Sequence, residues 1–160
     1  MAADEINAQG GVLGRKLRII VGYSEQGNYQ STALVTKQLL SQNVVAIISG
    51  GGSSSTLKTA ELTIAAGVIA VTPSSTSQAI SLLADNDLVW RTIPSDAFQG
   101  AIAAKILDSL GIQSVSVLHI DNAYGRDLFK AFQHSFEGKG GHTVVAASYP
   151  ERKEIGRAHV

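Results

Sequence analysis

The sequence predicts an α/β fold in which helices cover doubly wound parallel sheets. Short runs rich in Val and Ile alternate with helical stretches along nearly all of the 160 residues. These runs are apolar on both faces, which is typical of parallel strands covered on both sides by helices. The connections between them are short. Alternation of this kind predicts right-handed crossovers between neighbouring parallel strands.

Each strand is expected where a short apolar run is rich in β-branched residues, and each helix where leucines, isoleucines or phenylalanines recur at helical spacing. Gly67, Gly111 and Gly138 stand where helices should end. In chain order the expected elements are strand 17–21 (LRIIV), helix 29–43, strand 44–48 (VVAII), helix 54–67, strand 68–72 (VIAVT), helix 77–85, strand 88–92 (LVWRT), helix 96–111, strand 114–120, helix 124–139 and strand 142–148.

Composition excludes several classes of function. The 13 basic and 13 acidic residues cancel, and no polybasic run is present, so neither nucleic acid nor a membrane surface is an expected partner. The absence of cysteine excludes disulfides and thiolate metal sites. The four histidines show no metal-ligand spacing. No apolar run approaches the roughly 18 residues of a membrane span. We therefore expect no metal and no cofactor.

Two polar loops follow apolar strands at the edge where doubly wound sheets bind ligands. They are SGGGSSST (49–56) and TPSST (72–76). The first loop looks like a phosphate cradle, but it lacks both the Walker pattern and the GxGxxG pattern. No GxSxG string accompanies the serines, so they are expected to donate hydrogen bonds and not to act as nucleophiles.

A singly charged anion fits this first loop better than a phosphate does. The glycines allow close approach to the backbone, and the hydroxyls of 53–56 join the free N–H groups of a helix start. Thr76 can donate from the neighbouring loop, and a carbonyl near Ser74 can accept from an ammonium. Together these groups describe a site for an α-amino acid. The residues alone leave a second interpretation open, since Gly, Ser and Thr also cap helices without any ligand.

Five strings resemble the type I periplasmic binding proteins of the leucine/isoleucine/valine class, the receptors of branched-chain amino acid ABC transporters. Together they cover nearly the whole chain in the family's order. The resemblance implies two α/β lobes that close over a ligand: residues 1–92 as most of lobe one and 93–153 as the start of lobe two, both incomplete. The strings are EINAQGGVLGRKLRIIV (5–21), VVAIISGGGSSST (44–56), GVIAVTPSSTS (67–77), VWRTIPSDAFQGAIAAKIL (89–107) and HIDNAYGRDLF (119–129).

The resemblance also implies roles for individual residues. Ser53 would bind the ligand carboxylate, Thr76 would donate to it, Ser74 would offer its carbonyl to the ammonium, and Tyr124 would face the cleft from lobe two. The pattern departs from the family at Gly51, Gly52 and Ser75, which predicts a wider or more polar side-chain pocket than one made for leucine. The expected ligand-binding set is Gly52, Ser53, Ser54, Ser74, Ser75, Thr76 and Tyr124.

The resemblance further implies that a first strand, which lies between the strands at 17–21 and 44–48 in the family, is missing. Lobe two would also be cut after about half its length. Residues 154–160 are expected to be a non-native tail, because IGRAHV (155–160) corresponds to a sequencing adapter translated in frame. We therefore expect the isolated chain to fold poorly and to bind nothing tightly.

Three single residues complete the set of expectations. Trp90 is expected in the core near the crossing between the lobes. Arg91 can reach either an anion or this crossing, and the sequence does not decide between them. Asp121 is expected either to help bind an ammonium or to cap the following helix.

The expected function is that of an extracytoplasmic receptor, periplasmic or extracellular, that captures an amino acid and docks on an ABC transporter permease. It performs no chemistry. One alternative is a ligand-sensing regulatory domain of the same fold, such as an amide sensor or a receptor ectodomain, which a fused signalling domain would indicate. The other is a flavodoxin-like or nucleotide-binding enzyme, which would need a phosphate motif outside this sequence.

Overall fold

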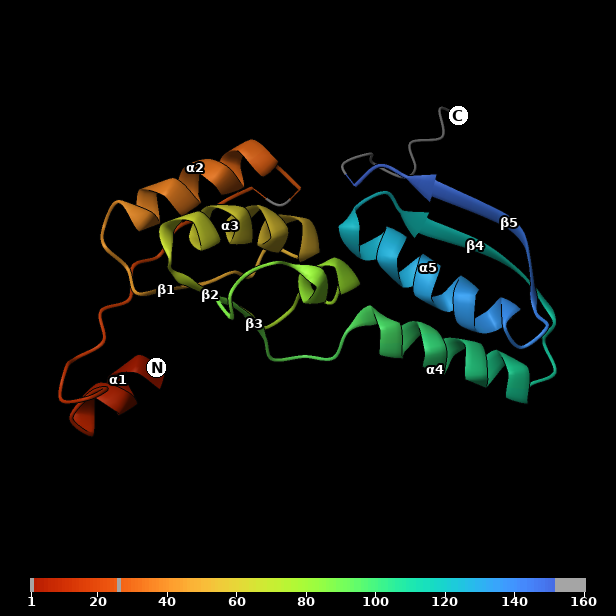
Figure 1. The fold of residues 1–160 in the computed structure, drawn as a ribbon, viewed down its shortest axis with the longest axis horizontal. Helices are drawn as coiled ribbons and strands as arrows, with labels where there is room; N and C mark the ends of the chain where they lie inside the picture. The colour runs from red at the N-terminus through yellow and green to blue at the C-terminus, as the bar shows by residue number, and fades with distance from the viewer. Residues whose placement is uncertain (1, 26, 152–160) are drawn as a thin grey trace, which may run out of the picture.

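The computed structural model describes residues 2–25 and 27–151. They form two α/β units joined by a short crossover at residues 92–95 (Figure 1). We call Ala2–Arg91 the first lobe and Asp96–Glu151 the second lobe. Both contain parallel strands connected through helices, so the predicted fold class is confirmed.

The first lobe contains a three-stranded parallel sheet in the order β1-β2-β3. Helices α2 and α3 pack against each other on one side of it (Figure 1). The register pairs Ile47 with Ala70 and Val71 with Trp90. The elements are α1 (Ala2–Ala8), α2 (Tyr29–Leu40), β1 (Ala46–Ile48), α3 (Ser53–Ala66), β2 (Ile69–Thr72), the 3₁₀ helix η1 (Gln78–Leu82) and β3 (Val89–Arg91).

The second lobe contains a two-stranded parallel sheet whose strands are connected through α5. Helix α4 packs along α5 (Figure 1). A β-bulge shifts the register between Val115 and Ser116. The elements are α4 (Asp96–Ser109), β4 (Ser114–Ile120), α5 (Ala123–Glu137) and β5 (His142–Tyr149).

Two glycines allow the close packing of the second lobe. A Cβ on Gly100 of α4 would lie 2.5 Å from the backbone nitrogen of Phe132, so only glycine lets α4 and α5 approach this closely. A Cβ on Gly125 would lie 2.1 Å from the carbonyl oxygen of Ile120. The absence of a side chain at position 125 therefore lets α5 begin directly above the end of β4, which places Tyr124 at the carboxyl edge of the sheet.

The prediction of a strand at 17–21 is wrong for the described structure. This segment pairs with no strand, and it is held by Asn7 of α1, whose side chain donates to the Leu17 carbonyl at 2.9 Å and accepts from the Leu17 N–H at 2.6 Å. A groove of about 460 Å³ is lined by residues 18–22 and 44–48, together with Leu39. A strand needs a neighbour to bond with, and along this groove neither segment has one.

The remaining predicted elements are present with small changes. The helix expected at 77–85 is only the short 3₁₀ helix η1. Trp90 is 56% exposed, not buried in the core, and its indole N–H donates to the Asp87 carbonyl. Ile48 and Ile69 are exposed as well, so the described residues cover one face of this sheet and leave the other open. No helix in the described ranges combines the length and the apolar character that crossing a bilayer requires.

Candidate functional site

A polar cleft of about 480 Å³ lies between the lobes, at the carboxyl ends of β1, β2 and β4. The starts of α3 and α5 point toward each other (Figure 1), and residues of both helix starts line the cleft. A helix start presents free N–H groups and the positive end of the helix dipole, so two such starts favour an anion between them. The cleft is lined by Gly51, Gly52, Ser53, Ser54, Ser74, Thr76, Gln99, Ile120, Asn122, Tyr124, Tyr149 and Glu151.

The start of α3 places hydroxyl protons where a ligand can use them. The N-cap residue Gly52 adopts a φ of +84° and provides no side-chain cap. The Ser53 hydroxyl accepts from the Ser77 N–H at 3.2 Å, and the Ser54 hydroxyl accepts from the Ala123 N–H at 3.1 Å. Because each oxygen is used as an acceptor, its own proton stays available for donation. Ser54 also links the two lobes directly.

A buried hydroxyl network behind the cleft fixes its two polar loops. The Thr56 hydroxyl lies 3.0 Å from that of Ser49 and 2.8 Å from that of Ser75. The Thr72 hydroxyl accepts from the Ser75 N–H at 3.2 Å. This network joins the end of β1, the start of α3 and the end of β2. Ser75 is fully buried within it and does not line the cleft.

The other predicted site residues of the first lobe lie on the cleft wall. Ser74 is exposed there and Thr76 is half-buried. The Thr76 carbonyl is already occupied, since it accepts from the Asp96 N–H at 2.8 Å. The structure therefore brings Gly52, Ser53, Ser54, Ser74, Thr76 and Tyr124 together around one cavity and places Ser75 behind it.

The second lobe contributes residues that sequence reasoning missed. Gln99, Asn122, Tyr149 and Glu151 all line the cleft. The Asn122 side chain caps α5 by accepting from the Gly125 N–H at 2.9 Å. That was the role expected for Asp121, which instead pairs with Arg126 at 2.6 Å on the surface. The asparagine in HIDNAYG was a usable capping signal, because Asn is as good an N-cap as Asp.

The crossover carries a cluster of charged residues. Arg91 donates to the Ser77 carbonyl at 2.9 Å and to the Ser81 hydroxyl at 2.6 Å, so it holds the loop beside the crossing in place. Asp127 of α5 accepts from the Ser77 hydroxyl and from the Ala79 N–H. These bonds tie the start of η1 to the second lobe.

Asp96 lies at the start of α4, directly after the crossover, and is completely buried. Neither of its carboxylate oxygens has a hydrogen-bond partner within the described residues. Burial is the largest influence on the pKa of the Asp96 carboxyl and raises it, and the negative charge of Asp127 raises it further. The Thr76 side chain and the positive charge of Arg91 act in the opposite direction and lower it. Together these influences raise the pKa of Asp96 above that of an ordinary aspartate, so ionising this carboxyl in the folded protein is unfavourable.

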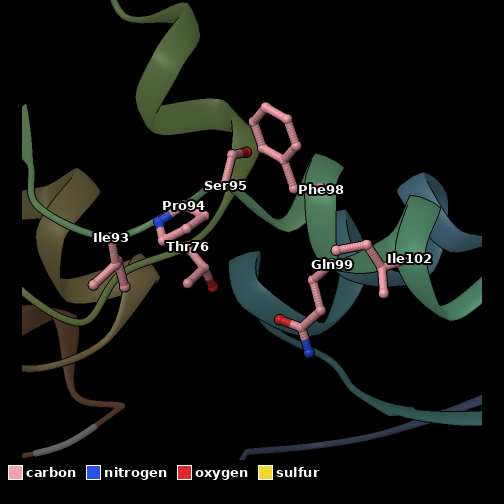
Figure 2. A pocket seen from close by; sticks show the side chains of 7 residues that line it. All are labelled: Thr76, Ile93, Pro94, Ser95, Phe98, Gln99 and Ile102. Carbon is pink, nitrogen blue, oxygen red and sulfur yellow. The ribbon is translucent and has the colours of Figure 1, made fainter.

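An apolar hollow of about 590 Å³ adjoins the cleft at the crossover. Thr76 and Gln99 line both the hollow and the cleft. In the view of Figure 2 their side chains point downward, whereas the Phe98 ring points upward. Its other lining residues are Ile93, Pro94, Ser95, Phe98 and Ile102. Within the described ranges, no group of three or more His, Cys, Asp or Glu residues is arranged to hold a metal ion.

Comparison with known proteins identifies the family to which this architecture belongs. The model of the receptor family ligand-binding region matches residues 1–158. The chain belongs to this family. Members similar to it include the Leu/Ile/Val/Thr-binding protein of Salmonella typhimurium, which is 31% identical over 145 residues, or 90% of this chain and 39% of that protein. The Leu/Ile/Val-binding protein of Escherichia coli is 30% identical over the same coverage.

Solved structures of the family superpose well on the chain. An ABC transporter substrate-binding protein from Desulfitobacterium hafniense in complex with Leu matches with a TM-score of 0.78 and 28% identity, over 92% of this chain and 44% of that one. Another structure described as an ABC transporter substrate-binding protein from the same organism gives a TM-score of 0.76. The resemblance found in the sequence is thus confirmed. The chain spans about two-fifths of the length of the relatives it matches.

Proposed function

We propose that this chain is part of a solute-binding receptor of an ABC transporter, and that its cleft captures an α-amino acid. The observation that carries the proposal is that Ser53 and Ser54 line the cleft at the start of α3 and that their hydroxyl oxygens accept from the Ser77 and Ala123 N–H groups, which leaves their protons to donate. A carboxylate there would receive charge-assisted hydrogen bonds worth about 1.5–3 kcal/mol each. Relatives named for binding Leu, Ile and Val support this ligand class.

The remaining predicted site residues complete an amino acid site in this proposal. Thr76 donates a further bond to the carboxylate, and the Ser74 carbonyl accepts from the ammonium. Tyr124 covers the ligand from the second lobe. A Cβ added at Gly52 would meet open space, whereas one at Gly51 would lie 3.0 Å from Ser55 Cβ. In this proposal the space beside Gly52 lets the pocket accept side chains bulkier or more polar than that of leucine.

The mechanism is a shift between open and closed arrangements of the lobes. A ligand held by both lobes binds the closed arrangement more tightly than the open one, and only this difference in affinity shifts the equilibrium. The crossover at 92–95 is the part of the described chain about which the lobes turn. We place the lobe boundary there, with residues 1–92 in lobe one and 93–153 in lobe two. The tail proposed at 154–160 lies outside the described residues.

The closed receptor docks on a membrane permease, outside the cytoplasm, and performs no chemistry on its ligand. This part of the proposal rests on the relatives, which are binding proteins and ABC transporter substrate-binding proteins. The family also contains ligand-binding regions of receptors, so a sensor domain of the same fold is the second candidate. Permease genes beside the reading frame would favour transport, and a fused signalling domain would favour sensing.

The ligand class can be tested on the full-length protein encoded by the reading frame that contains this chain. The thermal midpoint is measured with each of the twenty amino acids, with leucinamide and with ATP. We expect a rise in the midpoint with one or a few α-amino acids and none with leucinamide or ATP. Stabilisation by ATP alone would contradict the proposal.

A further inference from the structure

One carboxyl group beside the crossover is buried without a partner. Asp96 is the first residue of α4 and is completely buried where the two lobes meet. Its N–H donates to the Thr76 carbonyl of the first lobe at 2.8 Å, but neither of its carboxylate oxygens has a hydrogen-bond partner within the described residues. A buried carboxylate without a hydrogen bond is unfavourable, whereas a protonated carboxyl carries no charge to bury.

The charged groups around Asp96 do not compensate for its burial. The negative charge of Asp127 on α5 adds to the effect of burial on the pKa of Asp96, and the positive charge of Arg91 on β3 opposes it without outweighing it. The hydrogen bonds of the Arg91 guanidinium go to oxygens of the first lobe. The loop at 73–77 and helix η1 contain no titratable side chain. This arrangement of the lobes therefore shifts Asp96 toward its protonated form.

The surroundings of Asp96 come from both lobes. Thr76 and Arg91 belong to the first lobe, whereas Asp96 belongs to the second and follows the crossover at 92–95 directly. We propose that Asp96 takes up a proton from solvent when the lobes close and releases it when they open. As the lobes turn apart, the loop that carries Thr76 moves away from the start of α4. Water then reaches the carboxylate and stabilises its ionised form.

This inference rests on the proposed function, because it uses the same movement of the lobes, and it adds a coupling to protons. A ligand that closes the lobes causes proton uptake, and by reciprocity acid promotes closure. Between the pKa values of Asp96 in the open and closed arrangements, the closed arrangement binds more protons. The affinity for the ligand therefore rises as the pH falls through this window, by at most about tenfold per pH unit for a single proton.

The first test measures the protons taken up on binding. Leucine is titrated by calorimetry into the full-length wild type, Asp96→Asn and Asp108→Asn, in two buffers that differ in ionisation enthalpy. The pH is varied from about 4, near the ordinary pKa of aspartate, to about 8. Asp108 lies on the same helix and forms an exposed pair with Lys139, so Asp108→Asn is the matched control. Thermal midpoints show that each variant is folded.

We expect the wild type and Asp108→Asn to take up protons with leucine and to bind it more tightly as the pH falls. Asp96→Asn should lose this uptake and the accompanying change in affinity, since its amide cannot be protonated in this range. Leucine binding without proton uptake by the wild type, or with the same uptake by Asp96→Asn, overturns the inference while amino acid binding stands.

The second test needs no ligand. Small-angle X-ray scattering of the unliganded full-length protein follows the opening of the lobes at each pH. We expect the wild type to become more compact as the pH falls and Asp96→Asn to stay equally compact throughout. If no amino acid binds, the proposed function fails, and the scattering still decides whether protonation of Asp96 is coupled to closure. A wild type whose size does not change with pH, or an Asp96→Asn variant that changes as the wild type does, overturns the coupling.

Discussion

The carboxylate of Asp127 in the second lobe accepts hydrogen bonds from the Ser77 hydroxyl and the Ala79 N–H at the start of η1 in the first lobe. With the Ser54–Ala123 bond, it fixes how the two lobes meet around the cleft. Among the described residues, directed polar contacts therefore hold the two sides of the cleft together, which suits an interface that must open and close.

Removing the Asp127 contact should weaken the coupling between the lobes. In the full-length protein we expect Asp127→Ala to lower the free energy of unfolding by about 1–3 kcal/mol, because the buried Ser77 hydroxyl loses its acceptor and the Ala79 N–H keeps only its bond to that hydroxyl. Denaturant unfolding measures the change. Asp108→Ala is the control, since Asp108 forms only an exposed pair with Lys139. Equal stability of the two variants would show that the Asp127 contact is not a link between the lobes.

Ser53 and Ser55 provide a matched pair for testing the carboxylate site. Ser53 lines the cleft, whereas the Ser55 hydroxyl accepts from Thr32 at 3.4 Å inside the first lobe. We expect Ser53→Ala to weaken amino acid binding about tenfold or more, because a donor to the carboxylate is lost. Ser55→Ala should leave affinity unchanged. Calorimetric titration measures the affinity of both variants for the amino acid. If Ser53→Ala and Ser55→Ala bind it with equal affinity, Ser53 is not a hydrogen-bond donor to the ligand.

Ser75 is expected to affect stability and not binding. Its hydroxyl bonds to Thr56 behind the cleft, so Ser75→Ala leaves a buried threonine with one partner fewer. We expect a loss of about 1 kcal/mol in the free energy of unfolding and no change in affinity. Parallel unfolding and binding measurements on the variant test this. A clear change in ligand preference would instead place Ser75 in the side-chain pocket.

Asp96 predicts a distinct dependence of stability on pH. Its pKa is higher in the folded than in the unfolded chain, so the folded state binds more protons between those two pKa values. Its contribution to the free energy of unfolding therefore falls as the pH rises through that window. We expect Asp96→Asn to be more stable than the wild type at pH 7 and to lose this advantage on acidification. A destabilised variant at pH 7 would mean that the ionised carboxylate has a stabilising partner.

The groove between residues 18–22 and 44–48 predicts a further strand in the full-length protein. Val45 and Ile48 flank this groove and are 84% and 75% exposed, and both become buried if a strand enters. We expect backbone amides on both sides of the groove to exchange slowly with solvent in the full-length protein and rapidly in the 160-residue chain. Hydrogen exchange followed by mass spectrometry measures this. Equal protection in both proteins would contradict the prediction.

Much of the fold could be predicted because it depends on local patterns. The runs at 114–120 and 142–148 contain enough β-branched residues to identify strands, and the leucines and phenylalanines of α5 recur at helical spacing. The segment 17–21 has an equally apolar sequence, yet pairing needs a neighbouring strand that the described chain does not supply. Strand propensity alone therefore gave a wrong prediction there.

The site was predictable on the first lobe and only partly on the second. Glycines and hydroxyls at the start of α3 form one continuous string, so they can be recognised from the sequence. Gln99, Tyr149 and Glu151 come from different elements and meet only after the lobes pack together. No local pattern marks them. Ser75 stays a prediction as a ligand contact, and its place behind the cleft shows that the neighbours of a lining residue can face the interior instead.

The most direct test of the account is calorimetric titration of the full-length protein with the α-amino acid that stabilises it most. We predict one binding site per chain, with affinity reduced at least about tenfold by Ser53→Ala and by amidation of the ligand's carboxylate. That result would place the carboxylate at the start of α3. Binding of the amino acid and of its amide with equal affinity, unaffected by Ser53→Ala, would contradict the proposed site.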